Sequence, residues 1–91
     1  MRTPIRRTLR LQLKLGSSAV RAICDSRGFA LELPHGSVQP ISGELFRLLS
    51  AEPATIDRQI RELGLEEHRQ SVLEEIWKLV RCRGLRLAPL G

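Results

Sequence analysis

The stretch FALELPHGSVQPISGELFRLL, residues 29–49, contains the change of pattern that decides the fold. Residues 29–33 place Phe, Leu and Leu on one face and Ala and Glu on the other, which is typical of a half-buried strand. Proline and glycine interrupt this pattern at residues 34–37. From Ser42, a good N-cap, the apolar residues recur with helical spacing. The stretch therefore predicts that strands give way to helices near residue 42.

Two further strands are predicted before residue 29. Residues 9–15, LRLQLKL, alternate without a miss, so four leucines share one face opposite Arg10, Gln12 and Lys14. Residues 16–18 form a predicted turn, and residues 19–25 alternate more weakly. A second turn at residues 26–28 leads into the strand at residues 29–33. Three short strands joined by tight turns predict an antiparallel meander.

Three helices are predicted after residue 42. The first ends at Pro53, and Thr55 caps the second, which ends at Gly64. The third runs from about Glu66 to Arg83 and has acidic residues at its start and basic residues at its end, as the helix dipole favours. Gly84 ends it, and residues 85–87 are a possible short C-terminal strand. The order predicts an α+β, winged-helix-like fold, in which the last two helices have the spacing of a helix-turn-helix unit.

Length and composition indicate one domain. A chain of 91 residues with 42% hydrophobic and 27% charged residues has the composition of an ordinary globular protein. We expect a flexible basic segment at residues 1–7, one domain at 8–88 and a tail at 89–91. We see no membrane span and no signal peptide. Cys24 and Cys82 do not form a disulfide framework, so a reduced, cytoplasmic protein is expected.

The positive charge is local. Five of the 15 basic residues lie within the first 14 positions, where there is no acidic residue, and the net charge of the chain is +5. The remainder is therefore balanced. A helix-turn-helix unit suggests DNA binding, but Glu66 and Glu67 stand at the start of the third helix, where acidic side chains would be repelled by phosphates. A nucleic-acid-binding winged helix stays open as an alternative.

The candidates for chemistry are few. His35, His68, Cys24 and Cys82 lack the paired spacing that structural zinc sites use. Residues 66–67 and 74–75 are pairs of adjacent glutamates, which point about 100° apart on a helix and so form no facing acid–base pair. We interpret them as a helix start and a solvated face. Without a phosphate loop or a nucleophile motif, we expect a protein that is not an enzyme and has no metal or cofactor.

The order of elements resembles the PqqD-like family, small winged-helix modules that recognise precursor peptides in the maturation of ribosomal peptides. The resemblance covers residues 9–87 and depends on length, element order and the run Leu45-Phe46-Arg47-Leu48-Leu49, followed by Ile56 and Gly84-Leu85. The first strand is more basic and the aromatic content lower than in that family. The resemblance implies a non-catalytic protein that holds a leader peptide and presents it to a modifying enzyme.

This function implies that a leader peptide adds as a strand to the edge of the meander. Its side chains would lie between the third strand and the third helix, and the expected contacts are Phe29, Ala30, Leu31, Glu32, Leu33, Val72, Leu73, Ile76 and Trp77. The inward-facing members of this set also fit a simple sheet–helix core. A basic patch would steer an acidic peptide and consists of Arg6, Arg7, Arg10 and Lys14. Alternatively, these charges only keep an exposed strand soluble.

A third hypothesis keeps the fold and changes the function. The chain also resembles the winged-helix dimerisation or accessory domains appended to cupin-type oxygenases. Trp77 and the leucine-rich faces would then form a contact between subunits.

Overall fold

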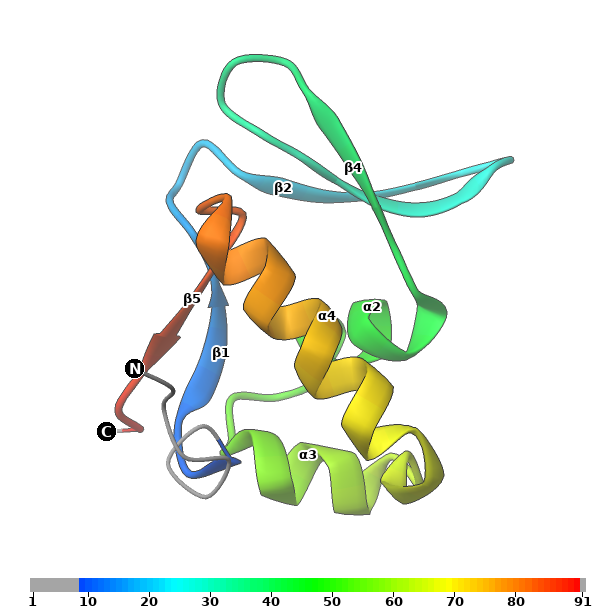
Figure 1. The fold of residues 1–91 in the computed structure, drawn as a ribbon, viewed down its shortest axis with the longest axis vertical. Helices are drawn as coiled ribbons and strands as arrows, with labels where there is room; N and C mark the ends of the chain where they lie inside the picture. Colours follow the sequence, from blue (N-terminus) through cyan, green and yellow to red (C-terminus); the bar gives the residue numbers. More distant parts are fainter. Residues whose placement is uncertain (1–8, 91) are drawn as a thin grey trace.

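The computed structural model describes residues 9–90, so the whole of the predicted segment 1–7 and the last residue of the tail lie outside the described residues. In chain order the elements are β1 (Gln12–Leu15), β2 (Arg21–Asp25), β3 (Gly28–Glu32), β4 (Val38–Ile41), α2 (Gly43–Ser50), α3 (Ile56–Glu62), the short 3-10 helix η1 (Glu66–His68), α4 (Arg69–Arg81) and β5 (Leu85–Ala88). The fold is α+β and winged-helix-like, with an antiparallel meander followed by helices, as predicted. The meander lies at one end of the molecule and α3 at the other (Figure 1).

The meander is one strand later in the sequence than predicted. It has the order β2-β3-β4, and both neighbouring pairs are antiparallel. Residues 34–37, predicted to end the strands, form a turn in which Leu33 donates its N–H to the Ser37 carbonyl at 2.8 Å. The chain then returns as β4, which the sequence analysis did not predict. Its proline and its length of four residues hide it from a pattern search.

β1 lies outside the meander, contrary to the prediction for residues 9–15. It pairs antiparallel with β5, so that Leu13 faces Leu87 and Leu15 faces Leu85. The possible strand at residues 85–87 is therefore present and is the partner of β1. The solvent face predicted for Gln12 is also wrong, because this residue is only 9% exposed. Its amide donates to the Pro89 carbonyl at 2.9 Å, which satisfies the buried polar group.

The helix starts follow the predicted capping residues. The Ser42 hydroxyl accepts from the Leu45 N–H at 3.1 Å, and the Thr55 hydroxyl accepts from the Arg58 N–H at 3.3 Å. Gly64 has φ 68° and ends the α3 region as predicted. The third helix is less regular than predicted, since it begins as η1 and its α-helical part starts at Arg69.

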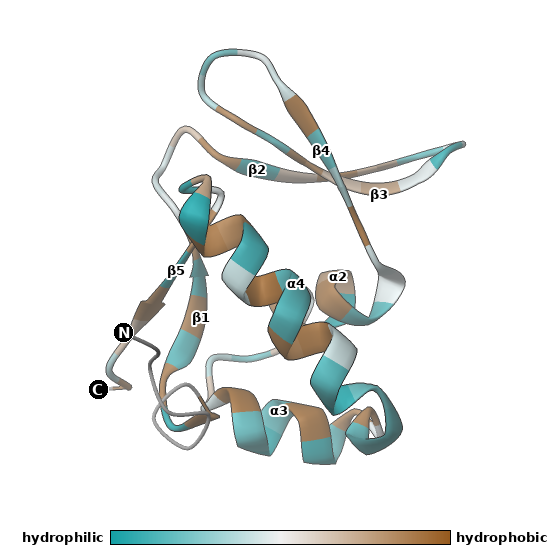
Figure 2. Ribbon diagram, in the orientation of Figure 1, coloured by the Kyte–Doolittle hydropathy of each residue, from teal (hydrophilic) through white to brown (hydrophobic). Residues whose placement is uncertain are grey.

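The core lies between the helices and the inner faces of both sheets. Each helix turns an apolar stripe inward and a polar one outward, as the alternating colours along α4 show (Figure 2). None of the helices within residues 9–90 is long and apolar enough to cross a membrane. The fully buried side chains of the core are Leu31, Leu45, Leu48, Ile56, Ile60, Val72, Ile76, Leu79 and Leu85.

The end of α4 differs from the predicted glycine stop. Arg83, at φ 65°, takes the left-handed position, and its N–H donates to the Val80 carbonyl at 3.1 Å. Gly84 donates to the Leu79 carbonyl at 2.9 Å, which completes a Schellman motif. A Cβ at Gly84 would come within 3.3 Å of Leu31 and Leu33 side-chain atoms. Gly84 therefore allows the close approach of Leu31 and Leu33, whereas Arg83 adopts the left-handed conformation.

We expect Arg83→Gly to raise the free energy of unfolding by about 0.5–1 kcal/mol, because an L-residue is disfavoured in this conformation and Arg83 is exposed. Urea unfolding followed by Trp77 fluorescence measures the change. Gly64→Ala is the matched control, since φ at Gly64 is 68° and the added Cβ would meet nothing within 4 Å. It should lower the free energy of unfolding by about 1 kcal/mol. An Arg83→Gly protein no more stable than the parent would contradict this account.

Candidate functional site

Within residues 9–90 the meander has two open edges, and neither belongs to the strand that was expected to receive a peptide. Residues 29–33 fall largely in β3, which is paired on both sides, with β2 and with β4. An added strand needs unpaired main-chain N–H and C=O groups, which occur only on edge strands. Strand addition to this meander therefore has to take place at β2 or at β4.

The hydrogen-bonding pattern of the sheet shows which residues direct their main-chain N–H and C=O groups toward each open edge. The N–H of Leu33 points to the β4 side of the sheet, where it binds the Ser37 carbonyl. Main-chain groups of successive residues point to alternate sides of an antiparallel strand. With the observed register, the groups of residues 38 and 40 therefore point to the open edge of β4, and those of residues 22 and 24 to the open edge of β2.

The edge of β4 is partly blocked for main-chain pairing. Val38 offers both an N–H and a C=O, and its side chain is 53% exposed. Pro40 offers a C=O alone, since proline has no N–H. The next residue in phase is Ser42, whose N–H already donates to a Glu75 carboxylate oxygen at 2.9 Å. A strand added here would obtain its main-chain donor from Val38.

A cleft opens where β4 ends, between the start of α2 and one face of α4. It is an open cleft with a volume of about 400 Å³, and it is lined by Ser42, Glu44, Ser71, Val72, Glu74, Glu75 and Lys78. The α4 members recur at intervals of three and four residues and so share one face of that helix. Three carboxylates against one ammonium give the cleft a negative balance. It suits a basic side chain better than an acidic one.

Glu75 connects the two walls of the cleft. One carboxylate oxygen accepts from the Ser42 N–H at 2.9 Å, and the other accepts from the Ser42 hydroxyl at 2.6 Å. These are charge-assisted bonds in a partly buried place, where they are stronger than neutral ones. Glu75 was interpreted above as part of a solvated face; instead it fixes the residue that caps α2. Glu74 lacks this role and bonds to Gln70 on its own helix at 3.1 Å.

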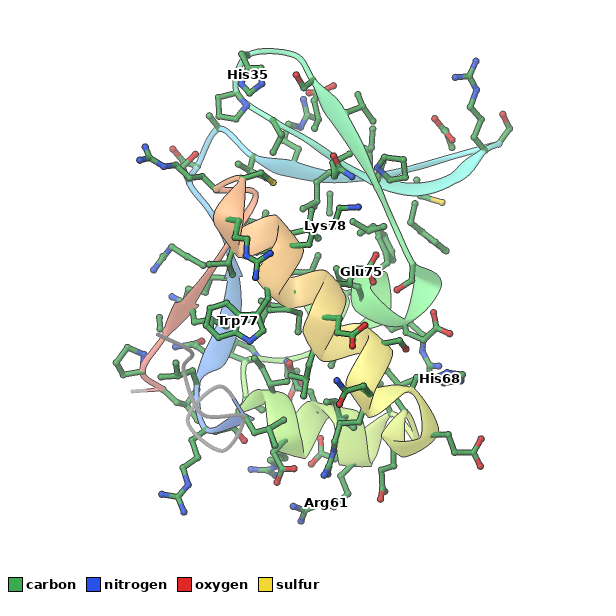
Figure 3. All side chains as sticks on the ribbon, in the orientation of Figure 1. His35, Arg61, His68, Glu75, Trp77 and Lys78 are labelled. Carbon is green, nitrogen blue, oxygen red and sulfur yellow. The ribbon has the colours of Figure 1, made fainter. Side chains whose placement is uncertain are left out.

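The α4 residues expected at the site divide between three places. Val72 lines the cleft, although its side chain is buried. Leu73 and Ile76 belong to the core. Trp77 lies on the side of α4 opposite Glu75 and Lys78, toward β1 (Figure 3). The structure therefore does not bring Trp77 together with the open edge of β4.

The expected residues of the central strand are similarly divided. Leu31 and Leu33 are core residues. Phe29 stacks on Phe46 with 4.4 Å between ring centroids. Ala30 and Glu32 alternate with these residues and lie on the other face of the sheet. The inward side chains thus follow the simpler sheet–helix core hypothesis.

The basic residues proposed for steering lie elsewhere. Lys14 is exposed on β1, which pairs with β5 and not with the meander, and Arg10 is exposed just before it. Arg6 and Arg7 lie outside the described residues. Neither Arg10 nor Lys14 lines the cleft. These two basic side chains therefore do not offset the negative charge of the cleft.

The arrangement offers a binding surface and little chemistry. In the part of the chain that the structure describes, no group of three His, Cys, Asp or Glu residues is placed to hold a metal ion. Both cysteines are free and exposed. Glu66 and Glu67 are exposed at the start of the last helix of the predicted helix-turn-helix unit, where acidic side chains would be repelled by phosphates. Comparison of the chain with protein-family models, curated proteins and solved structures finds no match.

Proposed function

We propose that this protein is a non-catalytic peptide-binding module that takes an extended peptide along the open edge of β4. The observation that carries the proposal is the continuity between that edge and the cleft, since Ser42 follows β4 directly and lines the cleft. Main-chain pairing with Val38 and the Pro40 carbonyl supplies affinity. A side chain of the added strand that points toward α4 enters the cleft and supplies specificity.

The cleft favours a peptide with a lysine or arginine at that position. A basic group there meets Glu44 and Glu74, whereas an acidic group would face them with Lys78 as its sole cation among the lining residues. This changes the ligand from the acidic peptide that the basic N-terminal residues suggested. Like charges placed next to each other are unfavourable, so the sign of this side chain discriminates between peptides.

The proposal includes a role in a larger pathway. In the PqqD-like modules that the chain resembles, the bound segment is the leader of a precursor peptide, and a modifying enzyme acts on the remainder. We propose the same division of labour here, in the cytoplasm, where the free thiols of Cys24 and Cys82 stay reduced.

Val38→Pro should weaken peptide binding about tenfold or more, because it removes the N–H at the open edge of β4. The probe is the tightest binder from a random-peptide display library selected on the protein, and titration calorimetry gives its dissociation constant. Ala22→Pro is the matched control, since it removes an edge N–H from β2 instead. Its affinity should stay within about twofold of the parent value.

Amide chemical shifts locate the bound peptide independently. We expect shifts at residues 38–41 and along the Ser71, Glu74 and Lys78 face of α4. Equal affinity of Val38→Pro and the parent, shifts confined to β1 and β5, or a library that yields no binder would each contradict the proposal.

A further inference from the structure

β2 presents an open edge that differs from the edge of β4. By the alternation described above, Ala22 and Cys24 direct their main-chain groups outward, and both have an N–H. Four of the five residues of the strand are exposed, and Ile23 is half-buried. Natural proteins commonly block such an edge with a proline, a bulge or a covering loop. The register with β3 runs through all five residues without a bulge.

We propose that β2 is a homodimer interface, in which it pairs antiparallel with β2 of a second copy about a two-fold axis at Ile23. The sequence of the strand, RAICD, is self-complementary in this register. Arg21 lies opposite Asp25 of the second copy, and the symmetry repeats the pair on the other side of the axis. Opposite charges directly across an antiparallel pair stabilise it. The interaction is isologous, as a two-fold contact requires.

The main-chain geometry fits the same register. Ala22 lies opposite Cys24 of the second copy, and both direct their N–H and C=O outward, so each such pair exchanges both of its hydrogen bonds. Arg21, Ile23 and Asp25 then form the closely spaced pairs that make no hydrogen bonds across the interface. In these pairs the side chains approach most closely. The two charge pairs and the contact between the Ile23 side chains therefore occupy the positions where side-chain pairing is strongest.

Neighbouring registers lack this complementarity. An axis at Cys24 would place Arg21 opposite Arg27 of the second copy, and like charges in that position destabilise the pair. An axis at Ala22 would place Arg21 opposite Ile23 and leave both charge pairs unmade. Both alternatives shift the pairing by two residues, which keeps the same main-chain groups in phase. The charges therefore select the register with the axis at Ile23.

The fixed direction of Asp25 also supports the pairing. Its Oδ1 accepts from the Arg27 N–H at 2.8 Å, which holds the carboxylate at the end of the hairpin. Within its own sheet Arg21 lies opposite Glu32. In the proposed dimer the guanidinium of Arg21 therefore lies between two carboxylates, Glu32 of its own chain and Asp25 of the second copy. The pairing joins the two meanders into one continuous sheet and leaves both β4 edges unpaired.

Sedimentation equilibrium over a wide concentration range tests the proposal, which does not depend on peptide binding. We expect the parent to be in a monomer–dimer equilibrium. Arg21→Asp alone and Asp25→Arg alone should each weaken dimerisation about tenfold or more, because each converts two attractions into two repulsions. An equimolar mixture of these two variants should dimerise like the parent, since every charge then meets its opposite. The double variant R21D/D25R should do so as well.

Covalent trapping provides a second measurement that does not rely on charge. Ile23→Cys in a C24A/C82A background places two thiols directly opposite each other, at a Cα separation of about 4.5 Å, within the range of a disulfide. It should crosslink rapidly under mild oxidation. Arg27→Cys in the same background, at the exposed hairpin turn, should not. A parent that sediments as a monomer throughout, a mixture that fails to restore dimerisation, or equal crosslinking at residues 23 and 27 would overturn the proposal.

Discussion

We expect Gly16→Ala to lower the free energy of unfolding by about 3 kcal/mol, the largest effect expected at the glycines that the structure describes. A Cβ at Gly16 would lie 1.9 Å from the Arg83 carbonyl oxygen and 2.9 Å from its carbon. These are main-chain atoms and cannot rotate away. The Gly16 N–H also donates to the carbonyl of the buried Gly84 at 3.0 Å, so a displacement that relieves the clash weakens this hydrogen bond. Urea unfolding measured by far-ultraviolet circular dichroism gives the value.

Gly43→Ala is the control for the general effect of replacing glycine. Its Cβ would come 3.3 Å from one side-chain atom of Phe29, which is able to adjust, and Gly43 begins α2, where alanine favours the helix. The expected change is within about 1 kcal/mol of the parent. If Gly16→Ala and Gly43→Ala are equally stable, residues 83–84 do not approach β1 as closely as the structure has them.

The Gly16 contact illustrates which parts of the fold are readable from sequence. Capping at Ser42 and Thr55 and the left-handed Gly64 are local events, determined within a few residues, and all three follow the predictions. The pairing of β1 with β5 joins residues more than 60 positions apart. Hydrophobic alternation predicts that residues 9–15 form a strand. It contains no information about which strand pairs with it.

The site was harder to predict than the fold for a related reason. The prediction ended the strands at residues 34–37 and assigned no element to residues 38–41, so it placed β3 at the edge that β4 has. The cleft residues Ser71, Glu74 and Lys78 do show a readable signal, because they recur at intervals of three and four along one face of the third helix. What the spacing cannot show is that Ser42, near the start of a different helix, completes that face.

The two proposed interactions use different edges of the meander: dimerisation uses β2 and peptide binding uses β4. A β2–β2 dimer occupies one edge of each sheet and leaves the β4 edges and their clefts at the two ends of the joined sheet. A dimer therefore presents two peptide sites facing away from each other. A precursor with two binding segments, or two precursors on one enzyme complex, would then gain in effective concentration without any new contact. Variants at residues 21 and 25 that prevent dimerisation would remove this gain and leave the intrinsic affinity of a single peptide site.

The bond between α4 and the cap of α2 leads to the second large effect. We expect Glu75→Ala to lower the free energy of unfolding by about 2–3 kcal/mol, because it leaves the Ser42 N–H and hydroxyl without the carboxylate that accepts from both. Glu75→Gln should lose about half as much. Its amide oxygen can accept from one of these donors, but its NH₂ group cannot accept from the other. Urea unfolding of the three proteins gives this order.

Glu74→Ala is the matched control, since it removes an adjacent carboxylate of the same helix whose bond is with Gln70 in an exposed place. It should change the free energy of unfolding by no more than about 0.5 kcal/mol. The two variants also separate structure from binding. Glu75→Ala loosens the residue that joins β4 to α2 and so disturbs the cleft wall, whereas Glu74→Ala removes charge from an intact cleft. If both variants are as stable as the parent, the carboxylate of Glu75 faces solvent and the cleft lacks the rigid wall on which peptide selection depends.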